Sequence, residues 1–437
     1  MELPDGDTAM LEAIQRAAFG YFLRSVNPSN GLIADSSRPG APCSIAATGM
    51  GLSAYVVGAE RGFLPRLEAA SLTLVALRFF RDSIQGEEPE ATGHRGFYYH
   101  FLDISTGRRI WESELSMIDT AILIAGALSS AMYFSGPSGE EKEIRELATF
   151  LYERVDWHWA AAEDSAELSM GWKPGAGFLS YGWGGYTEAL LLYVLGLGSP
   201  THPLTPQSYG AWTTTYQWEN LYDLDILFAA PLFIHQLSHL WIDFRGIQDA
   251  FMRAKHSDYF ENSRRATITQ SRYTERNPLR FKGYGKNCWG ITAGLGPGFM
   301  KRPGPNGMER QFYGYVARGV PFGPDDGTIA PWAVVGSLPF APEPVMAALH
   351  HFREMPGGAL SDQGILRSFN RSFSCIDGTD DGWTSPEDLG LDQGPVVLMI
   401  ENFQSGLLWR LMRECPAIVS GLRRAGFQRG WLNSDGR

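Results

Sequence analysis

Two acidic side chains, Asp119 and Glu188, stand where two strongly apolar segments begin. Asp119 opens the segment 115–128, and Glu188 follows an aromatic, glycine-rich stretch that contains Trp183 and Tyr186. Two carboxyl groups that face one cleft can cleave a glycosidic bond, one as the acid and the other as the base or nucleophile. The aromatic side chains beside Glu188 favour a sugar site, because helix capping alone does not require them.

Capping is the alternative interpretation of both acids. Ser116 and Asp119 fit the capping box, in which a serine and a following acid satisfy the free N–H groups of a helix. The helix dipole also favours an ionised carboxylate in the first turn, whereas a general acid needs a raised pKa. For Glu188 to act as the acid, burial among its aromatic neighbours must therefore outweigh the dipole.

Other acidic and aromatic residues are candidates for holding the sugar. The acids among them could equally start turns, and any one aromatic residue could equally belong to the core. Asp325, Asp326 and Asp392 are also secondary candidates for the base, after Asp119. The candidate binding residues are Glu114, Trp172, Trp183, Tyr186, His235, Tyr284, Trp289, Asp325, Asp326 and Asp392.

Two motifs resemble metal sites, and we predict that neither binds a metal. His235 and His239 have the spacing of the zinc-protease motif H-E-x-x-H, but Gln236 replaces the glutamate that would act as base. The segment 377–388 has a glycine at the sixth position of a calcium loop, but Asp388 stands where the loop needs glutamate, which favours a turn. We expect no cofactor. The scattered cysteines favour reduced thiols; they are Cys43, Cys288, Cys375 and Cys415.

The elements that carry these residues alternate in character. Some predicted helices are apolar on every face, which indicates burial on all sides, and others have one charged face. We expect the apolar helices to be inner helices with their N-termini on one side, and the amphipathic helices to surround them. The inner set is 44–59, 115–128, 186–195 and 395–413, and the outer set includes 65–82 and 140–156.

With about eleven or twelve predicted helices, this alternation favours an all-α fold, an (α/α)6 toroid of inner and outer helices. We further expect a β-hairpin over 96–111, helices over 248–269 and 342–352, and a final buried helix over 395–414. The segment 277–324 is rich in glycine, proline and aromatic residues. A long irregular stretch of this kind is typical of functional loops around a cleft.

Composition excludes several classes of protein. The chain has 437 residues without a linker-like segment, and we expect a single domain, 1–437. The net charge of −11 argues against a nucleic-acid partner, and no apolar run reaches the roughly 18 residues of a membrane span. The N-terminus lacks the pattern of a signal peptide, so we expect a cytoplasmic protein, or a periplasmic one if a leader was removed. The oligomeric state stays open.

Several motifs in chain order, from about residue 14 to residue 431, together resemble the bacterial glucoamylase-like family. That family includes endo-β-1,2-glucanases and a domain of cyclic β-1,2-glucan synthases. The resemblance implies an (α/α)6 barrel and glycoside hydrolysis. The motifs are Glu114-Leu-Ser-Met-Ile-Asp-Thr-Ala, His100-Phe-Leu-Asp, Gly-Ser-Pro-Thr-His202-Pro, Pro-Leu-Phe-Ile-His235-Gln, Asp258-Tyr-Phe-Glu-Asn-Ser-Arg-Arg, Asp325-Asp-Gly-Thr-Ile-Ala-Pro and Leu-Asp392-Gln-Gly-Pro.

The resemblance also assigns roles to single residues. It implies that Glu188 is the general acid and that Asp119 matches a second functional carboxylate, which is glutamate in the glucanases. Ser116 and Arg367 stand where the family has further acidic residues. We therefore expect a glycoside hydrolase that acts on a glucan, most plausibly β-1,2-linked. The alternatives are another exo-acting, glucoamylase-like glucosidase and, given the two replaced acids, a glycan-binding or sensing protein without catalysis.

Overall fold

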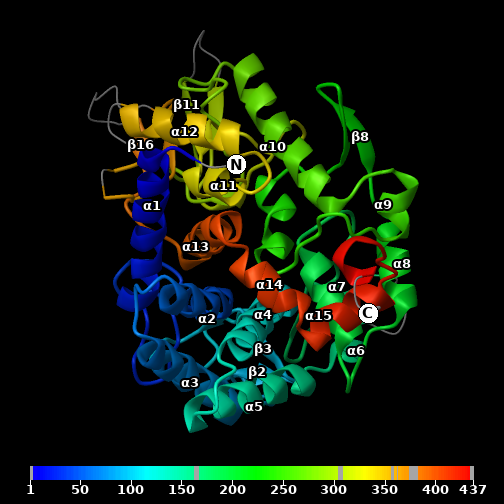
Figure 1. Ribbon diagram of the computed structural model, residues 1–437. Coiled ribbons are helices and arrows are strands. Elements are labelled where there is room, and N and C mark those ends of the chain that lie inside the picture. The colour runs from blue at the N-terminus through cyan, green and yellow to red at the C-terminus, as the bar shows by residue number, and fades with distance from the viewer. Residues whose placement is uncertain are drawn as a thin grey trace.

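Six helical elements form a closed inner ring in the computed structural model (Figure 1). Each element contacts the next one, and the last returns to the first. In ring order they are α2 (Ile45–Glu60), α4 (Met117–Tyr133), α7 (Ala189–Gly198), the pair η1 and η2 (Leu232–His235 and Leu237–Leu240), α11 (Pro331–Gly336) and α13 (Gly390–Gln404). The structure describes residues 3–161, 167–303, 309–355, 359–361, 363–373 and 382–433.

A second layer of helices packs around this ring, so that each inner element has an outer neighbour. The predicted (α/α)6 toroid of inner and outer helices is thereby confirmed. The outer helices are α1 (Asp5–Arg24) on α13, α3 (Arg66–Asp82) on α2, α5 (Gly139–Arg154) on α4, α15 (Pro416–Arg424) on α7, α10 (Tyr259–Arg276) on η1 and α12 (Pro342–Glu354) on α11.

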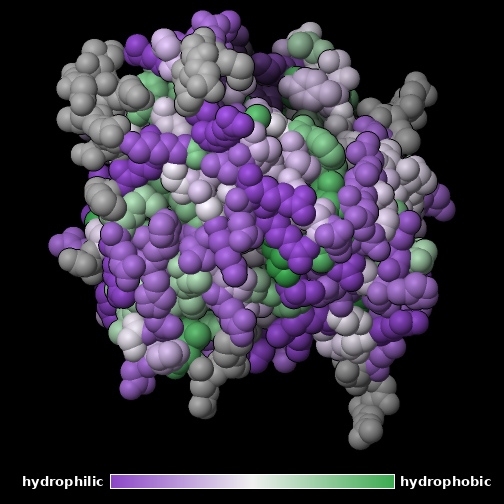
Figure 2. Space-filling view, turned by 90° about the horizontal axis from the view of Figure 1, so that it is seen from above, coloured by the Kyte–Doolittle hydropathy of each residue, from purple (hydrophilic) through white to green (hydrophobic). Residues whose placement is uncertain are grey.

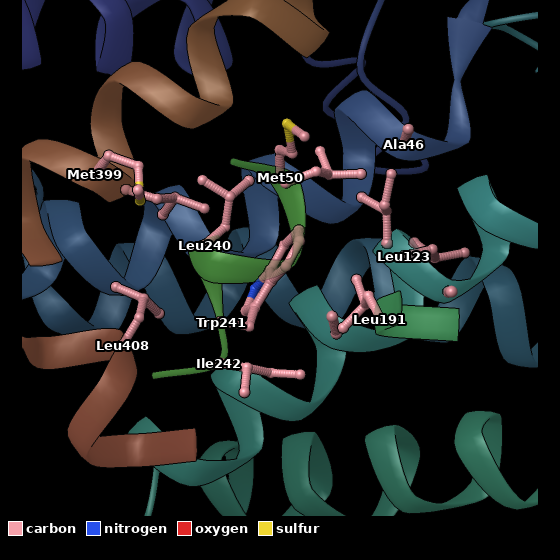
Figure 3. Packing of buried hydrophobic residues seen from close by; sticks show 14 of the residues in the cluster. Ala46, Met50, Leu123, Leu191, Leu240, Trp241, Ile242, Met399 and Leu408 are labelled. Carbon is pink, nitrogen blue, oxygen red and sulfur yellow. The ribbon is translucent and has the colours of Figure 1, made fainter. Parts of the chain in front are cut away.

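The inner helices pack closely because small residues lie between them. A Cβ added at Gly126 of α4 would lie 2.0 Å from the carbonyl oxygen of Gly49 in α2, so only glycine allows this approach. Large apolar side chains from several inner elements then meet near the centre of the ring (Figure 3). Trp241 belongs to this cluster and donates its indole N–H to Ser53 Oγ at 2.9 Å. The core therefore lies inside the ring, as the all-round apolar pattern predicted.

Short antiparallel strands lie in the connections and lead into inner helices. β5 enters α4 directly and belongs to a sheet of order β2-β3-β5-β6-β7, while β1 enters α2 and pairs with β4. The strands of these two sheets are β2 (Gly93–His94), β3 (Phe97–Tyr99), β5 (Leu115–Ser116), β6 (Gly171–Lys173), β7 (Gly177–Phe178), β1 (Cys43–Ser44) and β4 (Phe101–Leu102).

The other strands form small sheets in the loops. β14 (Thr328–Ile329), β15 (Phe369–Asn370) and β16 (Trp383–Thr384) form a three-stranded sheet. The two-stranded sheets pair β8 (Trp218–Leu221) with β9 (Leu224–Leu227), β10 (Ala293–Gly294) with β13 (Val316–Ala317), and β11 (Met300–Pro303) with β12 (Glu309–Phe312). The predicted irregular segment 277–324 thus holds short strands and loops.

The predicted bounds need several corrections. The predicted hairpin over 96–111 is reduced to one antiparallel bridge, Leu102 to Arg109, because Phe101–Leu102 pairs with Cys43–Ser44. The predicted helix over 248–269 is broken into α9 (Ala250–Ala254) and α10. The predicted final helix is divided into two. Its first part, α13, begins earlier than predicted, at Gly390, and stops before Gly406, which has a φ of +68°. The second part is α14 (Leu407–Arg413), and α15 follows it.

The remaining helices are short: α6 (Trp157–Ala160), α8 (Pro206–Thr213) and η4 (Gly430–Asn433). Hydrophilic side chains dominate the face shown in Figure 2, with apolar residues in smaller patches between them. In the part of the chain that the structure describes, no helix has both the length and the apolar run that a bilayer span requires.

Candidate active site

A cleft made of two adjoining cavities lies where the inner elements begin. We call the larger one, of about 330 Å³, the outer chamber, and the smaller one, of about 200 Å³, the inner chamber. Four residues line both chambers and mark the passage between them: His100, Asp119, Tyr315 and Leu391.

The first residues of the inner helices line this cleft. Ser44, the N-cap of α2, lines the outer chamber, and Asp119 in the first turn of α4 lines both. Glu188, the N-cap of α7, and Asp392, in the first turn of α13, line the inner chamber. The inner helices therefore begin on one side of the toroid, as predicted, and bring their N-terminal carboxyl groups together.

Asp119 both belongs to a helix cap and faces the cleft. Ser116 is the N-cap of α4, and its Oγ accepts the backbone N–H of Asp119 at 3.2 Å and donates to Oδ2 of the same residue at 2.5 Å. Oδ2 also lies 3.6 Å from Nε2 of His100. The capping interpretation is thus right for Ser116, and it leaves the Asp119 carboxylate at the passage between the chambers.

His100 bridges Asp119 and Glu114. Its Nδ1 lies 2.8 Å from Oε1 of Glu114, while Nε2 faces Asp119. Burial alone lowers the pKa of His100, but the charges of Asp119 and Glu114 raise that pKa to about 9. The hydrogen bond from His100 lowers the pKa of Glu114. Glu114 therefore pairs with His100, and the described lining of the chambers does not include it.

Glu188 has the surroundings of a general acid. Burial raises the pKa of its carboxyl group to about 7, against the effect of its own backbone N–H, and the charge of Asp119 adds to the rise. Among the described residues, the Glu188 side chain makes no capping hydrogen bond. Ser238 caps α7 instead, because its Oγ accepts the N–H of Leu191 at 3.1 Å and donates to the Glu188 carbonyl oxygen at 3.3 Å. The carboxyl group thus stays available to the cleft.

Two more acids in the cleft have raised pKa values. Burial is the main cause for both Asp35 and Asp392, and the charge of Asp35 raises the pKa of Asp392 further. Asp35 lines the outer chamber and Asp392 the inner chamber. Burial and the mutual repulsion of these carboxylates therefore both disfavour the ionised forms of Asp35 and Asp392.

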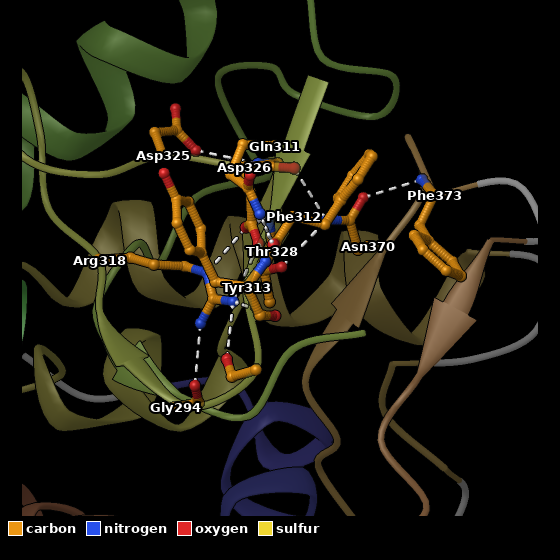
Figure 4. Close-up of polar contacts among 12 residues, drawn as sticks. Gly294, Gln311, Phe312, Tyr313, Arg318, Asp325, Asp326, Thr328, Asn370 and Phe373 are labelled. Atoms are coloured by element: carbon orange, nitrogen blue, oxygen red, sulfur yellow. Dashed lines mark hydrogen bonds and ion pairs between the residues drawn. The ribbon is translucent and has the colours of Figure 1, made fainter. Parts of the chain in front are cut away.

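Tyr315 lines both chambers, and a buried ion pair between Arg318 and Asp326 holds the loop that carries it. Figure 4 shows the contacts of this pair. Arg318 and Asp326 are 1% and 0% exposed, and Nε of the arginine lies 2.7 Å from Oδ1 of the aspartate. Arg318 also donates to the carbonyl oxygens of Gly294, Tyr313 and Gly314 at 2.8, 3.1 and 3.1 Å. The pair therefore fixes the loop on both sides of Tyr315. Tyr315 itself is 49% exposed, so it remains accessible at the passage between the chambers.

Several predicted sugar ligands instead support the cleft from outside. Asp326 holds the Tyr315 loop, and Asp325 accepts hydrogen bonds from Tyr273 at 2.9 Å and Tyr284 at 2.6 Å. Trp172 stacks on His94 with the ring centroids 5.0 Å apart. The described lining of the chambers omits these residues and the other buried aromatic candidates, which are Trp183, Tyr186 and Trp289. Among the ten predicted binding residues, the described lining of the two chambers contains Asp392 alone.

The Phe, Tyr and Trp residues in the described lining of the chambers are Phe101, Trp111, Phe233, Tyr315 and Trp332. The sequence analysis did not propose any of them for the site. Tyr315 lies in the predicted loop system, and Trp111 ends the predicted hairpin, so both stand in segments that could have been searched. Their exposure depends on tertiary packing, which local sequence does not show.

His235 and His239 do not form a zinc site. They lie on separate 3₁₀ helices, and both are buried. His235 Nε2 lies 3.1 Å from the carbonyl oxygen of Ala229, and His239 Nε2 lies 3.0 Å from Ser263 Oγ. Burial lowers the pKa of His235 to about 4 and that of His239 to about 3. His235, predicted to bind sugar, lies outside the described chamber lining.

The calcium-like segment and the four cysteines are the other residues for which metal binding or thiol chemistry was considered. Within the described ranges, no group of three or more His, Cys, Asp or Glu residues could hold a metal ion. Cys43, Cys288 and Cys415 are buried free thiols, as predicted. Cys375 and the first part of the calcium-like segment, 377–381, lie outside the described residues.

Comparisons with known proteins agree with this architecture. Residues 180–416 match the family model named Glycoamylase, a glucoamylase family. A curated relative from Parabacteroides distasonis, named exo β-1,2-glucooligosaccharide sophorohydrolase (non-reducing end), is 28% identical over 96% of this chain. The chain spans 58% of that relative's length.

Two solved structures are similar to the whole chain. An endo-β-1,2-glucanase from Chitinophaga pinensis, in complex with sophorotriose and glucose, has a TM-score of 0.84 and 25% identity, covering 99% of this chain and 100% of its own. A β-1,2-glucanase from Parabacteroides distasonis has a TM-score of 0.83 and 25% identity, covering 98% of this chain and 61% of its own. With the family model matching more than half of its residues, the chain belongs to the glucoamylase-like family.

Proposed function

We propose that this protein is a glycoside hydrolase that cleaves β-1,2-linked glucooligosaccharides, with Glu188 as the general acid. One observation carries the proposal. Glu188 has no described capping bond and a pKa of about 7, and it shares the cleft with Asp119. An acid with such a pKa is protonated in part at neutral pH and can donate its proton to a leaving oxygen.

Asp119 serves as the second carboxyl group. It accepts a hydrogen bond from Ser116 at 2.5 Å, and its Oδ2 lies 3.6 Å from Nε2 of His100. In the proposed reaction, Glu188 protonates the glycosidic oxygen while Asp119 accepts a proton from the attacking water. Asp35 in the outer chamber and Asp392 in the inner chamber can hydrogen-bond sugar hydroxyl groups on either side of this pair.

The β-1,2 linkage is supported by the relatives rather than by the cleft geometry. Their names include a sophorohydrolase and an endo-β-1,2-glucanase, the latter in complex with sophorotriose and glucose. The two chambers suit sugar units on both sides of a scissile bond, because Asp119 stands at the passage between them. We also propose that the chain works as one domain, since α1 packs on α13 and α13 closes the ring against α2.

A product assay on a panel of glucans tests the proposal. The purified protein is incubated with β-1,2-, β-1,3- and α-1,4-linked glucooligosaccharides, and the products are separated by size. We expect products from the β-1,2-linked series. Release of glucose from the α-1,4 series alone would show a glucoamylase-like specificity instead. Binding of β-1,2 chains by titration without any product would show a sugar-binding protein that lacks catalysis.

A further inference from the structure

Trp111 is held at the outer chamber in a conformation that its residue type does not favour. Its φ is +56°, and the next residue, Glu112, has a φ of +50°. Left-handed backbone is unfavourable for residues with a Cβ, and two in succession require support from the surrounding structure. Trp111 is nevertheless 69% exposed and lines the chamber. Strained backbone conformations cluster at active sites and ligand-binding sites, so the exposed indole in this chamber is a candidate ligand contact.

The turn that carries Trp111 is anchored at both ends. The N–H of Ser113 donates to the carbonyl oxygen of Ile110 at 3.0 Å, which closes the turn around Trp111 and Glu112. Ser113 Oγ donates to the carbonyl oxygen of Phe101 at 3.2 Å, and the Ile110 N–H donates to the same oxygen at 3.2 Å. The backbone of the turn is therefore held against β4.

Trp111 is connected to the catalytic carboxylates through aromatic contacts. Its ring lies 5.4 Å from that of Phe101, at an interplanar angle of 56°. Phe101 stacks on His100 at 4.0 Å and 14°, and His100 reaches Asp119. A continuous strip of rings thus leads from the exposed indole to the passage between the chambers.

We propose that Trp111, supported by Phe101, is a stacking platform for a glucose unit distant from the scissile bond. This inference rests on the proposed function, since the occupant is a glucan chain. A pyranose ring has one face of C–H groups, and such a face packs well on the flat surface of an indole. Arg38 and Glu387 line the same chamber and pair at 2.5 Å, so they can hydrogen-bond the hydroxyl rim of the same unit.

Chain-length dependence tests the platform. Trp111→Ala, Trp111→Phe and the parent protein are assayed for kcat and KM with β-1,2-glucooligosaccharides of increasing length. Both variants keep a Cβ, so the backbone strain is the same in each and the comparison isolates the ring. For long chains we expect Trp111→Ala to raise KM by about 3- to 10-fold, with most of the affinity retained in Trp111→Phe. For the shortest chain that is cleaved, we expect no change.

Phe322→Ala is the matched control, because Phe322 is 71% exposed and lies outside the described chamber lining. It should leave KM unchanged at every length. An equal loss at all lengths in Trp111→Ala, or no loss at any, would overturn the platform.

Direct binding separates this inference from the proposed function. Titration of long β-1,2 chains into Glu188→Gln and into Glu188→Gln/Trp111→Ala requires no catalysis. Weaker binding by the double variant supports the platform even if the parent protein hydrolyses nothing, which would refute only the proposed function. Equal binding by both proteins would refute the platform alone, and hydrolysis by the parent would still stand.

Discussion

Ser116 and Asp119 are joined by two hydrogen bonds of opposite direction, one to the backbone and one to the carboxylate. One hydroxyl group thus stabilises the start of α4 and orients a proposed catalytic group. Ser116→Ala should lower the free energy of unfolding by about 1 kcal/mol, the usual effect of losing a cap, and should also reduce turnover. Denaturant unfolding and kcat are the two measurements.

Ser138 provides the matched control for this cap. It is the N-cap of the outer helix α5 and accepts the N–H of Glu141 at 3.2 Å, away from the cleft. Ser138→Ala should therefore cost similar stability and leave turnover per folded molecule unchanged. If both variants behaved alike in turnover, Ser116 would have no role beyond capping.

Glu188→Gln keeps the shape of the side chain but removes the ionisable proton, so the side chain can no longer act as a general acid. General acid–base assistance is typically worth about 10²- to 10⁴-fold, so kcat should fall by that order while ligand affinity changes little. Asp258→Asn is a control at another helix start, because Asp258 caps α10 by accepting the N–H of Glu261 at 2.7 Å. A Glu188→Gln protein that unfolds more easily yet cleaves at the parental rate would exclude Glu188 from the mechanism.

The pH dependence of activity and stability follows from two raised pKa values. The Glu188 pKa is about 7, so kcat/KM should fall as the pH rises above about 7 and the acid loses its proton. This pKa is raised above its ordinary value of 4.5, so protonated Glu188 favours the folded state. That contribution to the free energy of unfolding is present at low pH and is lost as the pH rises through about 7.

His100 adds a second decrease in stability with pH. Its imidazolium form favours the folded state, and this contribution is lost as the pH rises through about 9. Thermal unfolding from pH 5 to pH 9.5 should therefore show a falling midpoint, and Glu188→Gln should flatten the lower part of that fall. A midpoint that rises across this range would contradict both assignments.

The buried pair of Arg318 and Asp326 should matter for both stability and activity. Asp326→Asn leaves the guanidinium buried without its counter-charge, which typically costs about 3–5 kcal/mol. Turnover should fall too, because the loop that carries Tyr315 loses its anchor. The exposed pair of Arg78 and Glu143 is the control, and Glu143→Gln should cost about 1 kcal/mol or less. Equal unfolding free energies for the two variants would disprove this role.

Exhaustive chelation should leave turnover unchanged. The basis is chemical, because Gln236 cannot act as the base of a zinc protease and donates its amide to the carbonyl oxygen of Ala333 at 2.6 Å. The assay is kcat before and after dialysis against a chelator. Loss of activity that zinc or calcium specifically restores would show that a metal takes part.

Local patterns were sufficient to predict the ring and to place Glu188 at the start of an inner helix, where it lines the cleft. Helices that are apolar on every face must be surrounded, and this requirement alone identified α2, α4 and α7 as inner elements. Glu188 could be predicted because a carboxyl group between an aromatic loop and such a helix is buried by necessity. Asp392 was a secondary candidate for the base and a candidate sugar ligand, with a turn residue as the alternative because aspartate often starts turns; it lies in the first turn of α13 instead.

The aromatic side of the cleft could not be predicted in the same way. Trp172 and Tyr186 are close in sequence to Glu188, yet they pack against His94 and Tyr259 and lie in the core. Trp111 faces the cleft only because a strained turn directs it there. Whether an indole packs inside or faces a ligand depends on partners that are distant in sequence, and composition does not identify them.

The closed ring also has a consequence during synthesis. Ser44, at the start of α2, and residues of α4 line the cleft, but Asp392 and the contacts of α13 that close the ring come more than 250 residues after α4 in the chain. Until α13 has been synthesised, the ring cannot close, and the side of α2 that packs against α13 has no partner. The complete lining of the inner chamber, which includes Asp392, therefore forms only after the chain has been translated past α13.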